Sequence, residues 1–362
     1  MTHSHTAADL VTSSLRVIRD GQHPGGGYVA CPTYPTYRFA WLRDGAFCAY
    51  AMELHGQQDS AAAFHRFVAA TMLGNAELVR AATLAAGNGR RPERMPPARY
   101  TLTGKLESAG GETWPNFQLD GYGTWLWTLR EHTRRGGALT DAARDAAQLV
   151  SHYLRAAGAL PCYDCWEEHG HLRHTSTLGA VIAGLSAAAD FLDDAEAAAA
   201  TVSLRERLAT RHVRNGSYVK HEESDLVDGS LLWLALPFGI AAVDDPVMAR
   251  TAARVADELT GPTGGVRRYL GDTFYGGGEW LLLTAWLGWY HAEAGDRATA
   301  ERLRGWIESH ATAEGHLPEQ VTDAPQAAAQ VAPWAAKWGP VATPLLWSHA
   351  MYLVLAHALR DG

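Results

Sequence analysis

The segment CYDCWEEHGH, residues 162–171, concentrates chemically active groups in a short stretch of the chain. It holds two thiols, three carboxylates, a Trp and two His. Such a set fits three kinds of chemistry: a zinc site, a thiol–disulfide redox pair, or the acid of a hydrolase. The rest of the sequence has to decide among these three hypotheses.

The zinc hypothesis rests on a C-x-x-C pair followed closely by histidines. Its candidate ligands are Cys162, Cys165, His169, His171 and His174. Structural zinc sites usually take their ligands from two separated pairs, whereas Cys31 and Cys48 stand alone, and we expect both to be buried. A redox pair favours a βαβ context, and the flanking sequence here is helical. We therefore expect no metal and no cofactor, with a zinc-dependent hydrolase as an alternative that metal analysis would decide.

The hydrolase hypothesis needs one carboxyl that stays protonated near neutral pH and a second one as its partner. A carboxyl held against an aromatic face, with other carboxylates nearby, can have its pKa raised enough for this. Asp164, Trp166, Glu167 and Glu168 provide such a group. For glycoside hydrolysis the partner is a carboxylate across the sugar. Glu319, in the loop HLPEQV, is the candidate.

Helical periodicity dominates the elements that must position these residues. In LGAVIAGLSAAADFL, for example, apolar residues repeat at three- and four-residue steps, and strand-like alternation is almost absent from the chain. The pattern predicts about twelve helices. They cover 7–19, 44–55, 59–86, 118–134, 140–157, 177–192, 195–212, 224–237, 245–260, 279–296, 298–312 and 343–360.

Loops that carry aromatic and charged residues recur about every two helices. They include GGGYVACPTYPTYRF, GGETWPN, PCYDCWEEHGHLRH, GVRRYLGDTFYGGG and GHLPEQVTDAPQ. Helix hairpins arranged around a ring would gather these connections at one mouth. No Pro-rich or Ser-rich linker divides the chain. We therefore predict an all-α fold, an (α/α)6 barrel, with residues 1–362 forming a single catalytic domain.

Charge and composition narrow the class of ligand. The formal net charge of −8 disfavours nucleic acid and anionic membranes as partners. The N-terminus MTHSHTAADL has no signal-peptide pattern, and no uncharged apolar stretch of about 18 residues occurs, so we expect a cytoplasmic protein. Thirteen Trp residues offer flat apolar faces on which sugar rings can stack, although most should fill the core. A neutral sugar is the expected ligand.

The motifs, taken in order, resemble those of the glucoamylase family, glycoside hydrolase family 15. YRFAWLRDGAF (37–47) resembles that family's Trp-x-Arg-Asp segment, and DCWEE (164–168) is similar to its acid motif. The other matching stretches are PNFQLDGYG (115–123), RYLGDTFYGGGEW (268–280), LPEQ and PLLWSHAMYL. The resemblance covers residues 37–353.

The resemblance implies a role for each matching residue. Glu167 takes the place of the general acid and Glu319 that of the general base, and the outcome would be inversion at the anomeric carbon with the two carboxyls about 6.5–9.5 Å apart. Arg43 and Asp44 match the pair that holds the non-reducing glucose through its hydroxyls. Arg268, which Tyr269 follows, matches the second arginine of that subsite.

Other residues are expected around the sugar. The further candidates for substrate binding are Tyr37, Trp41, Trp114, Asp120, Trp166, Glu168 and Trp338. Each Trp is as readily a core residue as a sugar platform, and Asp120 is as readily a helix cap. We expect Asp164 and Glu168 to tune the acid rather than to react.

The resemblance therefore implies an exo-acting, inverting hydrolase that releases β-glucose from the non-reducing end of short α-glucosides. An α-1,6 linkage, as in isomaltose, is expected, because a single-domain, intracellular enzyme, as expected here, suits imported oligosaccharides. The alternatives are a maltooligosaccharide glucohydrolase or a trehalase of the same family, and a catalytically silent sugar-binding protein on this scaffold.

Overall fold

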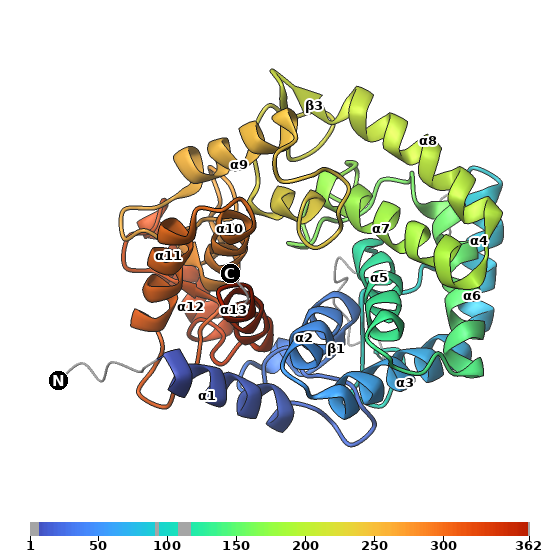
Figure 1. Ribbon diagram of the computed structural model, residues 1–362, viewed down its shortest axis with the longest axis horizontal. Coiled ribbons are helices and arrows are strands. Elements are labelled where there is room, and N and C mark those ends of the chain that lie inside the picture. The colour runs from blue at the N-terminus through green and yellow to red at the C-terminus, as the bar shows by residue number, and fades with distance from the viewer. Residues whose placement is uncertain (1–6, 91–93, 108–116, 361–362) are drawn as a thin grey trace.

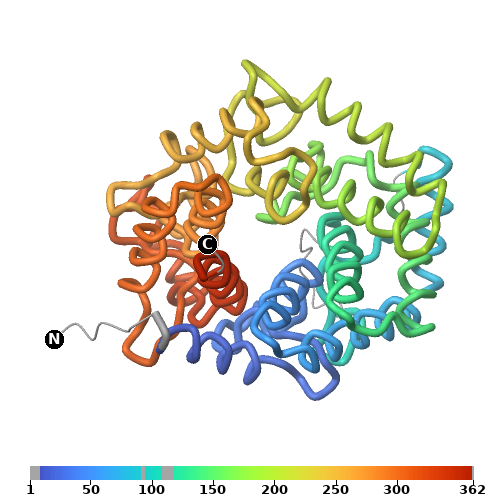
Figure 2. The backbone as a smooth tube through the Cα atoms, viewed as in Figure 1, coloured from blue at the N-terminus to red at the C-terminus, as the bar shows by residue number. Residues whose placement is uncertain are grey.

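Helices alternate between outer and inner positions around a ring in the computed structural model, which describes residues 7–90, 94–107 and 117–360 (Figures 1 and 2). The outer helices are α1 (Ala7–Asp20), α3 (Gln58–Gly74), α6 (Asp141–Ala157), α8 (Ala195–Arg211), α9 (Pro246–Leu259) and α11 (Arg297–Ser309). The inner elements are α2 (Leu42–Leu54), α5 (Asp120–Arg134), α7 (Thr175–Leu192), the 3-10 helix η2 (Gly229–Leu234), α10 (Leu281–Glu293) and α13 (Leu346–Ala358). Each inner element contacts the next one, and α13 contacts α2, so the ring closes. The fold is the predicted (α/α)6 barrel.

The remaining described elements lie in the connections between these helices. Two helices, α4 (Ala76–Gly87) and α12 (Val331–Trp338), stand outside the alternation. Within the described residues, three antiparallel pairs join two-residue strands: β1 (Ala40–Trp41) with β2 (Arg99–Tyr100), β3 (Val213–Arg214) with β4 (Ser217–Tyr218), and β5 (Glu279–Trp280) with β6 (Gln320–Val321). The other 3-10 helices are η1 (Pro35–Tyr37), η3 (Phe274–Gly276) and η4 (Ala328–Gln330). The pair β5–β6 ties the segment that begins α10 to the segment that follows Glu319.

Two predicted helices differ from the observed elements. The helix predicted over 59–86 is interrupted at Asn75, where the backbone leaves helical angles (φ −114°, ψ 21°) and the side-chain Nδ2 donates to the carbonyl of Thr71 at 2.7 Å. The helix predicted over 224–237 is reduced to η2. Asp228 caps η2 through a bond from Ser230 N, and the following chain reaches a proline that cannot continue a helix. Helix α12 was not predicted, although its partly buried residues Val331, Trp334 and Trp338 recur at three- and four-residue steps, because the helix is only eight residues long and otherwise exposed.

Helix α7 is the one described helix that is long and apolar enough to cross a membrane by length and composition, although it contains Asp190. Its 18 residues have a mean hydropathy of 1.4, and 72% of them are buried inside the protein. Neighbouring helices therefore cover it, as expected for a core helix of a barrel. At one point α5 and α7 approach so closely that a Cβ on Gly123 would lie 2.2 Å from the carbonyl oxygen of Ala180. The cellular compartment stays a prediction.

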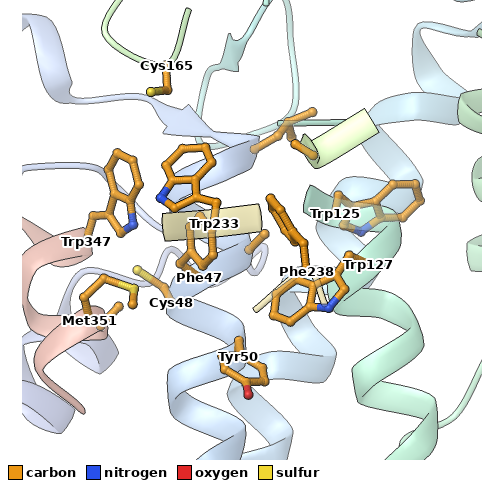
Figure 3. Close-up of a cluster of buried hydrophobic side chains, with 14 of the residues drawn as sticks. Phe47, Cys48, Tyr50, Trp125, Trp127, Cys165, Trp233, Phe238, Trp347 and Met351 are labelled. Carbon is orange, nitrogen blue, oxygen red and sulfur yellow. The ribbon is translucent and has the colours of Figure 1, made fainter. Parts of the chain in front are cut away.

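Aromatic side chains fill the axis of the barrel (Figure 3). Phe47 of α2 stacks on Trp347 of α13, with ring centroids 5.7 Å apart. It also contacts Trp286 of α10 at 4.9 Å and Trp233 of η2 at 5.8 Å. The ring centroid of Trp347 lies 6.4 Å from that of Trp166 in turn, so the apolar core continues directly into the segment 162–171. Inner elements therefore share one core, and that core supports the loops above it.

Candidate active site

Residues at or just before the N-terminal ends of the inner elements gather at one mouth of the barrel. Arg43, in the first turn of α2, pairs with Asp120, the first residue of α5, and its guanidinium carbon lies 4.8 Å from the ring of Trp347 at the start of α13. Trp166, in the loop before α7, contacts Trp280, which caps α10, at 5.3 Å between ring centroids. This arrangement brings together the loops that the sequence analysis singled out.

Arg43 is the centre of a buried polar cluster at this mouth. Its Nη1 donates to Gln118 Oε1 and to Asp120 Oδ2, each at 3.0 Å, and its Nη2 donates to Asp44 Oδ2 at 3.2 Å. Burial raises the pKa of Asp44 above its ordinary value, although Arg43 opposes this effect. Among the described residues, Asp120 Oδ1 and Arg43 Nε have no hydrogen-bond partner. Such buried atoms are available to a polar ligand or to water.

Glu167 lies on a tight turn whose geometry is set by Asp164. The Asp164 Oδ1 atom accepts hydrogen bonds from the backbone N–H of Trp166 at 3.0 Å and of Glu168 at 2.9 Å. Glu167 itself has a positive φ of 68°, which is costly for a residue with a side chain. Its Oε1 accepts a hydrogen bond from Trp41 Nε1 at 3.0 Å. The turn therefore presents the Glu167 carboxyl to the side chain of Trp41 in β1.

Glu168, the next residue, belongs to the cluster around Arg268. Arg268 Nη2 donates to Glu168 Oε1 at 3.3 Å, and the hydroxyl of Tyr269 donates to the other oxygen of Glu168. Arg268 Nε also donates to Asp272 Oδ2 at 2.7 Å. Burial alone would lower the pKa of Arg268, but Asp272 and Glu168 raise it well above its ordinary value. The Arg268 guanidinium is therefore a permanent buried cation.

Glu319, just before β6, is 4% exposed and has few polar contacts. The hydroxyl of Tyr37 donates to Glu319 Oε1 at 3.2 Å, and Oε2 has no hydrogen-bond partner within the described part of the chain. Burial raises the pKa of Glu319 to about 8, with smaller contributions from Asp44 and Glu167, while Arg268 and the Tyr37 hydrogen bond oppose the increase. The site therefore disfavours the charged form of this carboxyl.

The two candidate catalytic carboxyls are held by neighbouring aromatic side chains. Tyr37, which binds Glu319, and Trp41, which binds Glu167, have ring centroids 5.5 Å apart. The charge of Glu167 also contributes to the raised pKa of Glu319, as expected for carboxyls that share one site. Segments that are distant in sequence thus meet at one mouth of the barrel.

Of two further candidate sugar platforms, the structure describes one. Trp114 lies outside the described residues. Trp338 ends α12, is half-buried, and has the Lys337 Nζ atom 4.7 Å from its ring centroid. Within α12 it is Trp334 that contacts Phe274, near Arg268, at 5.0 Å. The roles of both candidate platforms stay predictions.

The described residues contain no preformed cluster of metal ligands of the kind that the zinc hypothesis requires. In these ranges no group of three or more His, Cys, Asp and Glu side chains is placed to hold a metal ion. Cys162 and Cys165 are buried, whereas His169 and His171 are exposed. Burial raises the pKa of Cys165 well above its ordinary value, which disfavours the thiolate that zinc would need.

Several site residues were not predicted from the sequence. Gln118 and Trp347 lie inside motifs that we quoted, so inspection of those motifs could have identified them. Lys220 and Asp228 lie in a stretch without a recognised motif. The Lys220 Nζ atom lies 3.2 Å from Asp164 Oδ2 and 2.6 Å from Asp228 Oδ2. No spacing rule would have placed this lysine beside the acid turn.

Comparison with known proteins identifies the family. The model of glycosyl hydrolases family 15 matches residues 8–337. The isomaltose glucohydrolase of Kribbella flavida is 43% identical over 360 residues, covering 97% of this chain and 92% of that protein. An uncharacterized glycosyl hydrolase of Methanocaldococcus jannaschii is 25% identical, covering 92% of this chain and 53% of that protein.

Solved structures agree with this result. A wild-type glycosidase superposes with a TM-score of 0.92 at 41% identity, covering 98% of this chain and 97% of that one. A variant glycosidase solved in complex with glucose matches equally well. The glucoamylase of Saccharomycopsis fibuligera, at 16% identity and a TM-score of 0.73, covers 100% of this chain and 98% of that one and shows the shared fold alone. The chain belongs to glycoside hydrolase family 15 and is a glycoside hydrolase.

Proposed function

We propose that this enzyme is an inverting, exo-acting α-glucosidase that releases β-glucose from the non-reducing end of short α-glucosides. The observation that carries the proposal is the pair Glu167 and Glu319, held on neighbouring aromatic side chains beside the buried Arg43 and Arg268. Two carboxyls that flank a polar pocket are the usual machinery of glycoside hydrolysis.

In this mechanism Glu167 gives its proton to the glycosidic oxygen while the bond between that oxygen and C1 breaks. Glu319 takes a proton from a water whose oxygen forms the new bond to C1 on the opposite face, so the configuration inverts. Inverting enzymes separate the two carboxyls by about 6.5–9.5 Å to admit this water. The raised pKa of Glu319 makes it a stronger base once ionised, and the positive charge that develops on the sugar favours the ionised form.

The cluster around Arg43 is proposed to bind the terminal glucose. Arg43, Asp44 and Asp120 offer directional donors and acceptors to adjacent hydroxyls, and burial penalises any sugar that leaves them unpaired. Arg268 would complete this subsite from the opposite loop. The remaining proposed contacts are those of Tyr37, Trp41, Trp114, Trp166, Glu168 and Trp338.

The preferred linkage is proposed to be α-1,6, as in isomaltose. The 43% identical relative named isomaltose glucohydrolase supports this preference. Hydrolysis of a panel of glucose disaccharides that differ only in linkage tests it. The highest kcat/KM should be on isomaltose, whereas a preference for maltose or trehalose would favour one of the alternative activities. No hydrolysis of any glucoside would favour a silent sugar-binding protein.

The same panel tests the zinc alternative. Activity should survive EDTA, because two carboxyls supply both proton transfers. Loss of activity that added zinc restores would instead support a role for Cys162 and Cys165 as ligands.

A further inference from the structure

We infer that Lys220 is a positioning residue for the general acid, an inference that rests on the proposed function of Glu167. The chain contains three lysines, and this one is buried, with 5% of its surface exposed. Its ammonium lies between the carboxylates of Asp164 and Asp228 and touches no other carboxylate at salt-bridge distance in the described part of the chain. It therefore fixes two acidic residues that hold the acid turn.

The first link runs through Asp164. Oδ2 of Asp164 accepts from Lys220 at 3.2 Å, while Oδ1 accepts from the backbone N–H groups of Trp166 and Glu168 on either side of Glu167. Burial alone would raise the pKa of Asp164, but Lys220 and then His174 outweigh it and lower the pKa. Lys220 thus keeps Asp164 ionised, which is the form that accepts both backbone bonds most strongly.

The second link runs through Asp228. Asp228 Oδ2 accepts from Lys220 at 2.6 Å and from the indole Nε1 of Trp166 at 3.0 Å. The residue directly before Glu167 is therefore fixed at its backbone by Asp164 and at its side chain by Asp228. One ammonium connects both fixed points.

A third contact involves Tyr269. The Lys220 Nζ atom lies 3.8 Å from the centroid of the Tyr269 ring, and the hydroxyl of that ring donates to Glu168, the residue directly after Glu167. A compact ammonium can contact two carboxylates and a ring face at once, which a planar guanidinium does less readily. Both neighbours of the acid in sequence are thus held by partners of Lys220.

The backbone of Lys220 is itself fixed to the barrel. Its carbonyl accepts from the N–H of Thr175, the first residue of α7, at 3.0 Å, and its N–H donates to the carbonyl of Leu226 at 2.8 Å. The acid turn needs such a fixed point, because Glu167 and His169 both have positive φ values, 68° and 51°. Without its anchors the turn can relax and move the Glu167 carboxyl away from the glycosidic oxygen.

The test separates acid positioning from general damage by changing the leaving group. α-Glucosyl fluoride releases fluoride, which needs little protonation, whereas a disaccharide requires a proton from the acid. Lys220→Met should lower kcat/KM on the best disaccharide by about 100-fold, within the range that general acid catalysis contributes, and on α-glucosyl fluoride by less than about threefold. Glu167→Gln supplies the pattern of a lost acid, and Lys105→Met, at an exposed lysine, is the matched control.

Asp164→Asn provides a second variant in case Lys220→Met fails to fold. The asparagine oxygen can still accept both backbone bonds, and Lys220 keeps its pair with Asp228, but the ion pair that links Lys220 to Asp164 is lost. The same selective loss on the disaccharide is expected. Equal losses on both substrates, or no loss, in a folded variant would overturn the inference. If Glu167→Gln itself lacks the selective pattern, the proposed function fails instead.

Discussion

The turn that carries Glu167 and the strand entry that carries Glu319 hold the same functional group in different ways. The acid turn is surrounded by charge, with Asp164, Lys220 and Asp228 fixing its backbone and the indole of Trp166. The Glu319 carboxyl is buried and receives one hydrogen bond from Tyr37 among the contacts described.

This difference separates two uses of a protein environment. Around Glu167, strong directional contacts fix position and hold a backbone conformation that would otherwise be costly. Around Glu319, burial instead removes the carboxyl from water, which increases its proton affinity and raises its pKa to about 8. The comparison predicts that damage near the acid depends on the leaving group, whereas damage near the base depends on pH.

The largest expected effect is the loss of the base. Glu319→Ala should lower kcat by about 10³-fold or more on every substrate, including α-glucosyl fluoride, because all of them need an activated water. Azide enters the vacated space as a nucleophile without losing a proton, so added azide should restore turnover and yield β-glucosyl azide. Formation of α-glucosyl azide, or full activity without azide, would contradict the assignment of Glu319.

The loss of the acid should be nearly as large but selective. Glu167→Gln should lower kcat on disaccharides by about 10³-fold and leave hydrolysis of α-glucosyl fluoride nearly unchanged, because fluoride departs without a proton. Steady-state kinetics on the two substrates measure the contrast. If Glu167→Gln also loses its activity on α-glucosyl fluoride, and azide restores the activity of Glu167→Ala, the two carboxyls have exchanged roles.

The buried base should cost stability in a defined pH window. The folded pKa of Glu319 is raised from an ordinary value of 4.5 to about 8, so the folded state holds the proton more tightly and its stability falls as pH rises through this window. The glutamine in Glu319→Gln does not titrate. The free energy of unfolding of this variant should therefore rise relative to that of the wild type between pH 4.5 and 8, by a few kcal/mol at most. Thermal unfolding across this range measures the gain. The control is Glu77→Gln on the exposed part of α4, which should show no such trend. A stability gain of Glu319→Gln that is constant with pH would refute the link between the pKa of Glu319 and stability.

The smallest effect concerns the hydrogen bond from Tyr37. This bond lowers the pKa of Glu319, so Tyr37→Phe should move the acidic limb of the kcat/KM profile to higher pH and lower activity at neutral pH by about tenfold. The control is Tyr290→Phe. Tyr290 lies in the last turn of α10, and this change removes the hydrogen bond from its hydroxyl to the carbonyl of Val243. A shift of the limb to lower pH would contradict this account of the base.

Periodicity and motif order predicted the barrel and the loops that meet at its mouth. Inner helices such as α2 and α10 are buried along almost their whole length, and their apolar pattern is local enough to read from the sequence. The break at Asn75 and the fourth inner element, η2, were misread, because a side chain that bonds to a nearby backbone carbonyl, or an Asp cap followed further on by a proline, overrides a helical pattern.

The candidate site was predictable only where short motifs carry it. Glu167, Arg43 and Arg268 lie in recognisable segments, whereas Lys220 and Asp228 contact the acid turn through tertiary structure alone. The raised pKa of Glu319 was also hidden, since burial depends on what the barrel packs around the loop. Short sequence motifs can predict the reacting groups, but they do not predict the neighbouring residues that set the geometry and proton affinity of those groups.

The configuration of the first product tests the central claim, that Glu167 and Glu319 act as acid and base in a single displacement. Proton NMR during the first moments of isomaltose hydrolysis, before the glucose anomers equilibrate, resolves the two forms of the sugar. Our account predicts that β-glucose appears first. Initial release of α-glucose would mean retention through a covalent intermediate and would contradict it.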